Sequence, residues 1–307
     1  MSFKMQEANL YFKRREEIDI DKWDQCIRLS SNGLIYAYSF YLDRMADNWD
    51  VLVWNDYEAV MPLPWRKKFG IHYLYQPAFT AQLGVFGNNI TAHTIESFFS
   101  AIPSQFKLWE FSLNHGNVFY LEGYNLFDRV NYVLSLDQPY ETLYRNFREN
   151  TRRNIKKSVQ YGCYIKTDID IHEIINLARQ QPNAALQKDL TKFTLLYTLL
   201  KERSAAKSYA VFSNKDELLA SCVFTFSHNR AYYILVANHP NGRTLGASHA
   251  LIDAFIKDHA GQNLLLDFEG SDIRNLAFFY SSFGAREEKY PAIRLNNLPW
   301  YIKWMKD

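Results

Sequence analysis

The stretch from Val236 to Leu251 contains residue types that bind an anion. It reads VANHPNGRTLGASHAL, with Gly242 and Gly246 in a loop between a buried strand and an amphipathic helix. Backbone N–H groups in the first turn of a helix have no carbonyl partner within it, and the helix dipole adds partial positive charge there. Arg243 contributes a full charge beside them, so a diphosphate would fit this junction. A tight turn at Gly246 without any ligand is the alternative.

A second group of reactive side chains follows this stretch. The segment LLLDFEGSDIRNLAFFYSSFGA carries Asp267 and Glu269 at a strand end, and Asn275 and Tyr280 on the next helix. Residues two apart on a strand share a face, so both carboxylates are expected on one face, opposite Phe268. Two buried carboxylates need a partner or a function, whereas a strand end in contact with water needs neither. An alternative for Asn275 is a purely structural role, as a helix cap or a turn residue.

A strongly basic helical stretch precedes both groups. Residues 144–157 (YRNFRENTRRNIKK) carry six positive charges and one negative charge. Arg145, Arg148, Arg152 and Lys156 recur at helical spacing and are expected to line one face. One interpretation is a solvated helix. The other is a site for an anionic acceptor, a nucleotide-linked precursor or an RNA acceptor stem.

The elements that would position these groups repeat along the chain. The order in both halves is hairpin, strand, helix, strand. In the first half these elements are expected at 51–54 with 59–63, 71–75, 94–101 and 108–113. In the second half they are expected at 209–212 with 219–226, 231–237, 248–260 and 264–268, followed by a helix at 273–283 and a strand at 292–295.

A repeat of this length indicates a duplicated domain. We expect an α+β fold with two tandem domains, 1–137 and 138–307, each a mixed, mainly antiparallel sheet flanked by helices. The helical stretch 140–162 would connect the two halves.

Composition restricts the class of protein. The 307 residues are 48% hydrophobic, which suits two packed cores, and the net charge of +2 does not indicate nucleic-acid binding by the whole surface. Three widely spaced cysteines, Cys26, Cys163 and Cys222, match neither a disulfide framework nor a zinc site. The longest apolar run, near 232–237, is too short to span a membrane, and the N-terminus lacks a signal-peptide pattern. We expect a cytoplasmic protein without a metal, and its oligomeric state cannot be read from the sequence.

Two motifs resemble the GNAT acyltransferase superfamily. The cofactor loop of that family has the form Q/R-x-x-G-x-G/A, which residues 243–248 (RTLGAS) match except at Ser248. The next helix of the family has the form N-x-x-A-x-x-x-Y-x-x-x-G-F, which Asn275, Tyr280 and Phe283-Gly284 resemble with altered spacing. The resemblance covers about residues 140–295, and over the first 137 residues it rests on element order alone.

The sequence most resembles tandem-GNAT proteins related to FemAB peptidyltransferases and FemAB-like acetyltransferases. In those proteins the phrase DFEGS, here residues 267–271, and the basic run 145–157 have counterparts. The resemblance implies that the first domain is a degenerate GNAT-like domain and that the second carries an acyl-donor site.

The resemblance also implies transfer of an acyl group from acetyl-CoA or another acyl-CoA to an amine. Tyr280 would protonate the leaving thiolate, and Glu269, directly or through a water, would accept the amine proton, with Asp267 as second choice. As one of 21 tyrosines, Tyr280 could also be a core residue. The strand end would part from its neighbour and pair with the pantetheine arm. The donor would be bound by Val236, Ala237, Asn238, Arg243, Thr244, Leu245, Gly246, Ala247, Ser248 and Asn275.

Two other functions stay open. The first is a FemAB-type transferase that uses aminoacyl-tRNA and acts on a cell-wall precursor. Those relatives insert a coiled-coil arm that this chain lacks, and they have a Phe-Lys pair where this chain has Phe279-Tyr280. The second is a non-catalytic binding module, which the mismatch at Ser248 keeps open.

The resemblance leaves the acceptor undefined. It would be a small-molecule or peptidoglycan-precursor amine, and tandem domains commonly bind such a ligand in the cleft between them. Tyr75 and Phe79 are the residues expected there.

Overall fold

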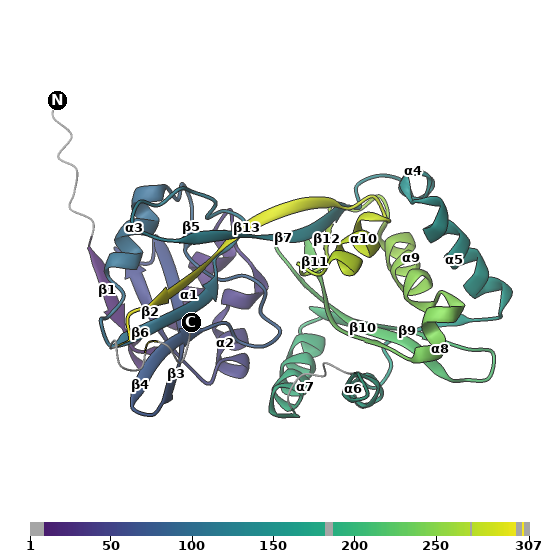
Figure 1. Ribbon diagram of the computed structural model, residues 1–307, viewed down its shortest axis with the longest axis horizontal. Coiled ribbons are helices and arrows are strands. Elements are labelled where there is room, and N and C mark those ends of the chain that lie inside the picture. The colour runs from purple at the N-terminus through teal and green to yellow at the C-terminus, as the bar shows by residue number, and fades with distance from the viewer. Residues whose placement is uncertain (1–8, 182–186, 271, 299–302, 304–307) are drawn as a thin grey trace. The chain divides into compact units, whose positions relative to one another are not determined.

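The computed structural model describes residues 9–181, 187–270, 272–298 and 303 (Figure 1). The chain forms two compact units. The first contains the residues up to Arg129 and those from Lys289 onward, and the second runs from Val130 to Glu288. The boundary predicted from the sequence lies after residue 137, with residues 289–307 in the second domain, so the structural units differ from the prediction at both points.

The first unit contains a mixed sheet with one parallel pair. Its neighbours are antiparallel except β4 and β6, which run parallel and are connected through α3. The order is β1 (Leu10–Lys13), β2 (Asn48–Trp54), β3 (Ala59–Lys68), β4 (Ile71–Tyr75), β6 (Phe106–Ser112) and β13 (Arg286–Asn296), with β5 (Phe86–Gly87) beside β3. The α-helices described in this unit are α1 (Ile20–Leu29), α2 (Ser39–Met45) and α3 (Ala92–Ser100). Two short 3-10 turns span Arg15–Glu17 and Ile35–Ala37.

Local sequence explains the first hairpin and the helix that follows the sheet. Strands β2 and β3 pair from Asn48 opposite Trp65 to Trp54 opposite Ala59, around a turn in which Asn55 has a positive φ. The Thr91 hydroxyl accepts a hydrogen bond from the Thr94 amide and caps α3. Phe98 and Phe99 of α3 then pack into the apolar core against the sheet.

The second unit repeats this arrangement with a second parallel pair. Its neighbours are antiparallel except β11 and β12, which are connected through α8 and α9. The order is β7 (Leu126–Ser135), β12 (Leu265–Asp267), β11 (Arg230–Asn238), β10 (Leu218–Ser227), β9 (Ala206–Phe212) and β8 (Tyr164–Thr167).

Helices of the second unit lie on both faces of this sheet. They are α4 (Tyr140–Asn146), α5 (Glu149–Gln160), α6 (Ile171–Arg179), α7 (Gln187–Glu202), α8 (Pro240–Leu245), α9 (Ala247–His259) and α10 (Arg274–Ser281). Figure 1 shows α6 and α7 on one face of β9 and β10, and α9 with α5 on the other. On the α9 face, Phe224 stacks on Phe255 with ring centroids 3.7 Å apart. Cys222 belongs to the same core, so Ser221, Val223 and Thr225 alternate to the α6–α7 face.

The α+β class and the repeated element order are therefore confirmed. The observed strands and helices overlap every range expected from the sequence. Helices α1, α2, α6, α7 and α8, the short strands β1, β5 and β8, and the long strand β7 were not predicted. Within the part of the chain that is described, no helix is both long and apolar enough to cross a lipid bilayer.

The basic stretch 140–162 is two helices and not one. Helix α4 ends at Asn146, and Arg148 precedes α5 with its amide donating to the carbonyl of Ser282 at 2.8 Å. Arg145 therefore lies on a different helix from Arg152 and Lys156. The predicted single stripe of Arg145, Arg148, Arg152 and Lys156 on one helix is wrong, because the chain turns at Phe147 and Arg148.

Candidate functional site

Strands β11 and β12 separate part-way along the second sheet. They pair only from Arg230 opposite Leu265 to Tyr232 opposite Asp267, where β12 ends while β11 continues to Asn238. Among the described residues, the edge of β11 from Tyr233 onward has no strand partner on that side. A bulge accompanies the separation, since Leu235 has φ +49° and the register with β10 shifts opposite it. The resemblance implied such a separation at this strand end.

The phenol of Tyr280 lies where the two strands separate. Its ring stacks on Phe268 with centroids 4.7 Å apart and meets Tyr233 edge-on at 6.4 Å. Tyr280 is 7% exposed. Burial is the main cause that raises the pKa of its hydroxyl above the ordinary value, and the negative charge of Glu269 adds to the effect. The hydroxyl therefore remains protonated at neutral pH and can act as a proton donor.

Asp267 belongs to a buried ion-pair network and not to an open strand end. Its Oδ2 accepts from Arg230 Nη1 at 2.7 Å, and its Oδ1 accepts from Asn131 Nδ2 at 2.8 Å. Arg230 also binds Glu288 through both terminal nitrogens, at 2.8 and 2.9 Å. With only 1% exposure and both oxygens bonded, Asp267 has the geometry of a structural group, which argues against its use as the second-choice base.

Glu269 does not share a strand face with Asp267, so that prediction is wrong. Strand β12 ends at Asp267, and Glu269 follows in a turn at φ +62°, with its amide donating to Asp267 Oδ1 at 2.8 Å. The next amide, that of Gly270, donates to Asn131 Oδ1 at 2.7 Å. The carboxylate of Asp267 and the amide of Asn131 thus fix the turn that carries Glu269. Ser271, the last residue of the DFEGS phrase, lies outside the described residues.

Arg230 and Asn131 were missed by the sequence analysis. Asn131 is fully buried on β7, far from Asp267 in sequence, so no local pattern indicates the contact. Arg230 left a weak signal, because it is a cation at the start of an otherwise apolar strand. A buried cation needs a buried anion, and Asp267 at the end of a neighbouring apolar strand is the natural partner.

The predicted loop between strand and helix is partly helical. Residues Pro240–Leu245 form α8, so Arg243, Thr244 and Leu245 lie on a helix and not in a glycine-rich loop. Gly246 has φ +72°, ends α8 and begins α9, whose first residues are the buried Ala247 and the half-buried Ser248. Arg243 and Thr244 are exposed beside this junction.

Both glycines of the junction are required by close backbone contacts. A Cβ on Gly246 would lie 2.4 Å from the carbonyl oxygen of Asn154 in α5, and one on Gly242 would lie 2.3 Å from that of Leu219 in β10. Helix packing alone thus explains why glycine occupies these positions. The His249 amide donates to the Gly246 carbonyl at 3.1 Å, so an anion at this helix start would meet the amides of Ala247 and Ser248.

Replacing Gly246 with alanine is expected to destabilise the second unit by about 1–3 kcal/mol, because the new methyl group meets a carbonyl and the positive φ disfavours a side chain. Gly261→Ala is the matched control. Gly261 has φ +81°, but its added Cβ would have nothing within 4 Å. Urea denaturation followed by circular dichroism compares the two variants. Equal losses would show that contact with α5 does not dictate glycine at 246.

Ser248, the mismatch in the cofactor motif, has a defined contact. Its hydroxyl donates to Asn238 Oδ1 at 2.6 Å, and the side chain of Gln181 donates to the Asn238 carbonyl at 2.8 Å. The carbonyl of Asn238 is thus already paired, although the sequence analysis assigned it to the pantetheine arm. Val236 is half-buried and Ala237 is buried. Asn275 is exposed in the first turn of α10, and Ile273, not Asn275, is the N-cap residue.

His249 also lies beside the junction and gives a pH-dependent prediction. Its ring is 4.8 Å from Phe279, and burial lowers its pKa to about 4. The unfolded chain, with a histidine pKa of about 6.5, then binds more protons between those two values. The free energy of unfolding should therefore decrease as the pH falls from about 6.5 to 4, by up to about 3 kcal/mol. Urea denaturation of wild type and His249→Phe at pH 7 and pH 4.5 tests this; an unchanged pH dependence in the variant would contradict it.

The basic residues of α5 line a hollow of about 790 Å³. Arg152, Arg153, Lys156 and Lys157 are among its lining residues, with the rings of Tyr144 and Tyr161 and the single carboxylate of Glu149. Four cations close together repel one another, so an anion bound there would be favoured electrostatically.

The residues expected to contact the acceptor lie in the first unit. Tyr75 is 7% exposed, and its hydroxyl accepts from the Asp47 amide at 2.7 Å. Burial raises the pKa of Tyr75 to about 12. Phe79 has φ +55°, and its carbonyl accepts from the Tyr41 hydroxyl. These contacts give both residues structural roles. In the described part of the chain, no three His, Cys, Asp or Glu side chains are grouped to hold a metal ion.

A family model of the acetyltransferase (GNAT) domain matches residues 145–272. The second unit thus contains a segment that matches the GNAT domain. The matched GNAT segment contains α5, the Gly246 junction, Asp267 and Glu269, whereas Tyr280 lies just beyond it.

Solved structures with the same fold include FemX, with a TM-score of 0.66, 12% identity and coverage of 96% of this chain and 99% of FemX. A tandem GNAT protein from the clavulanic acid biosynthesis pathway has a TM-score of 0.55, 11% identity and coverage of 95% and 99%. L-PGS from Bacillus licheniformis has a TM-score of 0.54, 11% identity and coverage of 94% of both chains. These likenesses place the chain's architecture with the tandem, FemAB-like GNAT folds. A search of curated proteins found no match.

Proposed function

We propose that the second unit is an N-acyltransferase that moves an acyl group from an acyl-CoA to an amine acceptor. The observation that carries the proposal is the separation of β11 from β12 at Tyr232 and Asp267, with the protonated phenol of Tyr280 at that point. The match of residues 145–272 to the GNAT domain supports acyl transfer as the class of reaction. Acyl-CoA is the donor that best suits this proposal.

The roles follow from the positions of the side chains. The unpaired edge of β11, with Val236 half-buried, offers backbone groups to an extended donor arm. The first amides of α9 and the exposed guanidinium of Arg243 favour the negative charge of a diphosphate. Tyr280 would donate a proton to the leaving thiolate, and Glu269, directly or through a water, would accept the amine proton. Asn238 and Ser248 are bonded to each other, so we assign them to positioning the strand end rather than to the donor.

Ligand binding tests the proposal. Acetyl-CoA and desulfo-CoA at 100 times their dissociation constants should each stabilise the protein by about 2.7 kcal/mol in thermal unfolding. Arg243→Glu should weaken their binding by about 1.5–3 kcal/mol, because a charge-assisted contact is replaced by repulsion. Arg179→Glu, an exposed arginine on α6 of the same unit, is the control for net charge. No stabilisation by either compound would refute donor binding.

A second candidate function is supported by the hollow on α5. Its four cations and two tyrosine rings favour an anionic or nucleotide-linked ligand, as a FemAB-like aminoacyl transferase acting on a cell-wall precursor requires. Stabilisation by uncharged tRNA or a nucleotide-linked precursor but not by CoA would favour this function. A lack of response to all of them would favour a non-catalytic binding module.

We also propose that the first unit is a degenerate GNAT-like domain and that the protein acts in the cytoplasm. The first unit shares the hairpin, strand, helix, strand order of the second. The three cysteines are free thiols, which suits a reducing compartment.

A further inference from the structure

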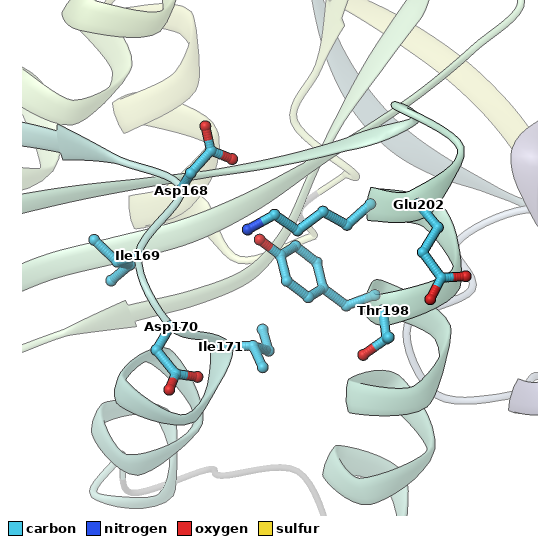
Figure 2. A pocket seen from close by; sticks show the side chains of 8 residues that line it. Asp168, Ile169, Asp170, Ile171, Thr198 and Glu202 are labelled. Carbon is cyan, nitrogen blue, oxygen red and sulfur yellow. The ribbon is translucent and has the colours of Figure 1, made fainter.

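We propose that the second unit has a separate binding site for a primary ammonium group on an aliphatic chain, in the hollow between the start of α6 and the end of α7. The hollow measures about 550 Å³. Figure 2 shows Asp168 and Asp170 on one side, and Thr198 and Glu202 of α7 on the other. This inference goes beyond the proposed function and does not depend on it.

The lining of the hollow suits the two parts of such a ligand. The buried side chains of Ile169 and Ile171 provide apolar surface for methylene groups. Asp168, Asp170 and Glu202 contribute three carboxylates, against the single ammonium of Lys201. The excess of negative charge favours a cationic ligand, and carboxylates form charge-assisted hydrogen bonds with ammonium groups.

A buried hydroxyl in the lining independently indicates a missing polar partner. Tyr197 is 3% exposed and lines the hollow, and its hydroxyl has no hydrogen-bond partner among the described residues. Buried polar groups in proteins are almost always hydrogen-bonded, so an unpaired one next to a hollow points to a ligand atom. A phenol oxygen can accept a hydrogen bond from an ammonium group.

Hydrogen bonds to the sheet fix the segment that carries the carboxylates. The amide of Asp168 donates to the Ser208 carbonyl at 3.0 Å, and the Ser208 hydroxyl donates to the Ile169 carbonyl at 3.3 Å. Asp170 caps α6 by accepting from the His172 amide through Oδ1 at 2.9 Å, which leaves Oδ2 for a ligand. The site is therefore held in place before any ligand binds.

The hollow is distinct from the proposed transfer site. Ser208, which anchors it, lies on β9, and β10 separates β9 from β11 in the sheet. The ammonium of Lys201 lies 6.0 Å from the centre of the Tyr197 ring. Lys201 lines the hollow, so its charge would repel a ligand ammonium bound there.

Titration with 1,5-diaminopentane, followed by the amide NMR signals of Asp168, Ile169 and Ile171, tests the proposal. We expect saturable shifts with a dissociation constant of about 1 mM or lower, and none with 1,5-pentanediol, which lacks the charge. Asp168→Asn and Tyr197→Phe should each weaken binding about three- to tenfold, and Lys201→Gln should strengthen it by removing a like charge from the lining. Glu173→Gln, an exposed carboxylate in the first turn of α6 that does not line the hollow, should leave binding unchanged.

A second arm with Nα-acetyl-lysine amide distinguishes a free diamine from a lysine side chain as the source of the ammonium group. Tighter binding of either compound supports the proposal and identifies that source. Absence of saturable shifts with both compounds overturns it. So does equal binding of the diol, or an equal loss of affinity in Glu173→Gln.

Discussion

Replacing Arg230 with methionine is expected to destabilise the second unit by about 3–5 kcal/mol, because it leaves the buried carboxylate of Asp267 without its cation. Arg230 connects β11 both to the end of β12 and to Glu288. Burial alone would lower the pKa of Arg230, but the attraction of Asp267 and Glu288 raises it above its ordinary value. The guanidinium is thus charged under all conditions in which the protein folds.

The composition of the chain offers a selective measurement. All seven tryptophans lie outside residues 130–288, so tryptophan fluorescence reports the first unit, whereas far-ultraviolet circular dichroism reports both. Arg230→Met should therefore shift the urea transition seen by circular dichroism more than the one seen by fluorescence.

Arg294→Met is the matched control for the ion pair. Arg294 also binds a carboxylate at 2.7 Å, that of Glu110, but the two side chains are 59% and 46% exposed. Because solvent screens this exposed pair, its loss should shift the urea transition far less than the loss of Arg230 does. If both variants lose the same stability, burial is not what makes the Arg230 pair important.

Replacing Tyr280 with phenylalanine is expected to lower the turnover number about 10²–10⁴-fold while CoA binding stays unchanged. The variant keeps the ring that stacks on Phe268 and removes only the hydroxyl, so the loss would reflect proton donation rather than packing. Release of CoA thiol from acetyl-CoA in the presence of a panel of amines measures the rate. Because the pKa of Tyr280 is raised, the rate should not decline through deprotonation of this group between pH 7 and 9.

Tyr132→Phe separates this effect from a general effect of tyrosine loss. The Tyr132 ring lies 6.4 Å from that of Tyr280, but its hydroxyl donates to Glu287 at 3.0 Å. We expect this variant to retain its turnover number. Full activity in Tyr280→Phe would remove Tyr280 from the proposed chemistry.

The sequence predicted those parts of the fold that depend on local patterns. The β2–β3 hairpin follows from two apolar runs around Asn55 and Asp56, and β11 from an almost unbroken apolar run. The apolar patterns of the sequence also predicted the order of strands and helices around the Gly246 junction. Tyr280 was singled out through its family resemblance, and the structure places it beside the end of the β11–β12 pairing.

The remaining features depend on contacts between residues far apart in the chain. Helix α8 interrupts the expected loop: His239 caps it and Pro240 is its first residue, which are local signals, whereas the close contact of Gly242 with the backbone of β10 is not. The role of Asp267 is set by Arg230 and Asn131, and no periodicity in the sequence reports such a contact. Pairing of β13 with β6 brings Arg294 next to Glu110, although the two residues are far apart in the chain. A prediction that divides the sequence into two consecutive halves therefore cannot place residues 289–307 in the first unit.

This return of the C-terminal segment affects the order in which the protein folds during synthesis. Strand β6 pairs with β4 on one side and with β13 on the other, and β13 follows the whole second unit in the chain. A ribosome therefore releases the last strand of the first sheet only after residues 130–288 have emerged. Until then β6 presents an open edge of unpaired N–H and C=O groups, which is prone to pairing with other chains. A nascent chain stalled before residue 289 would consequently require a chaperone or aggregate through the first unit.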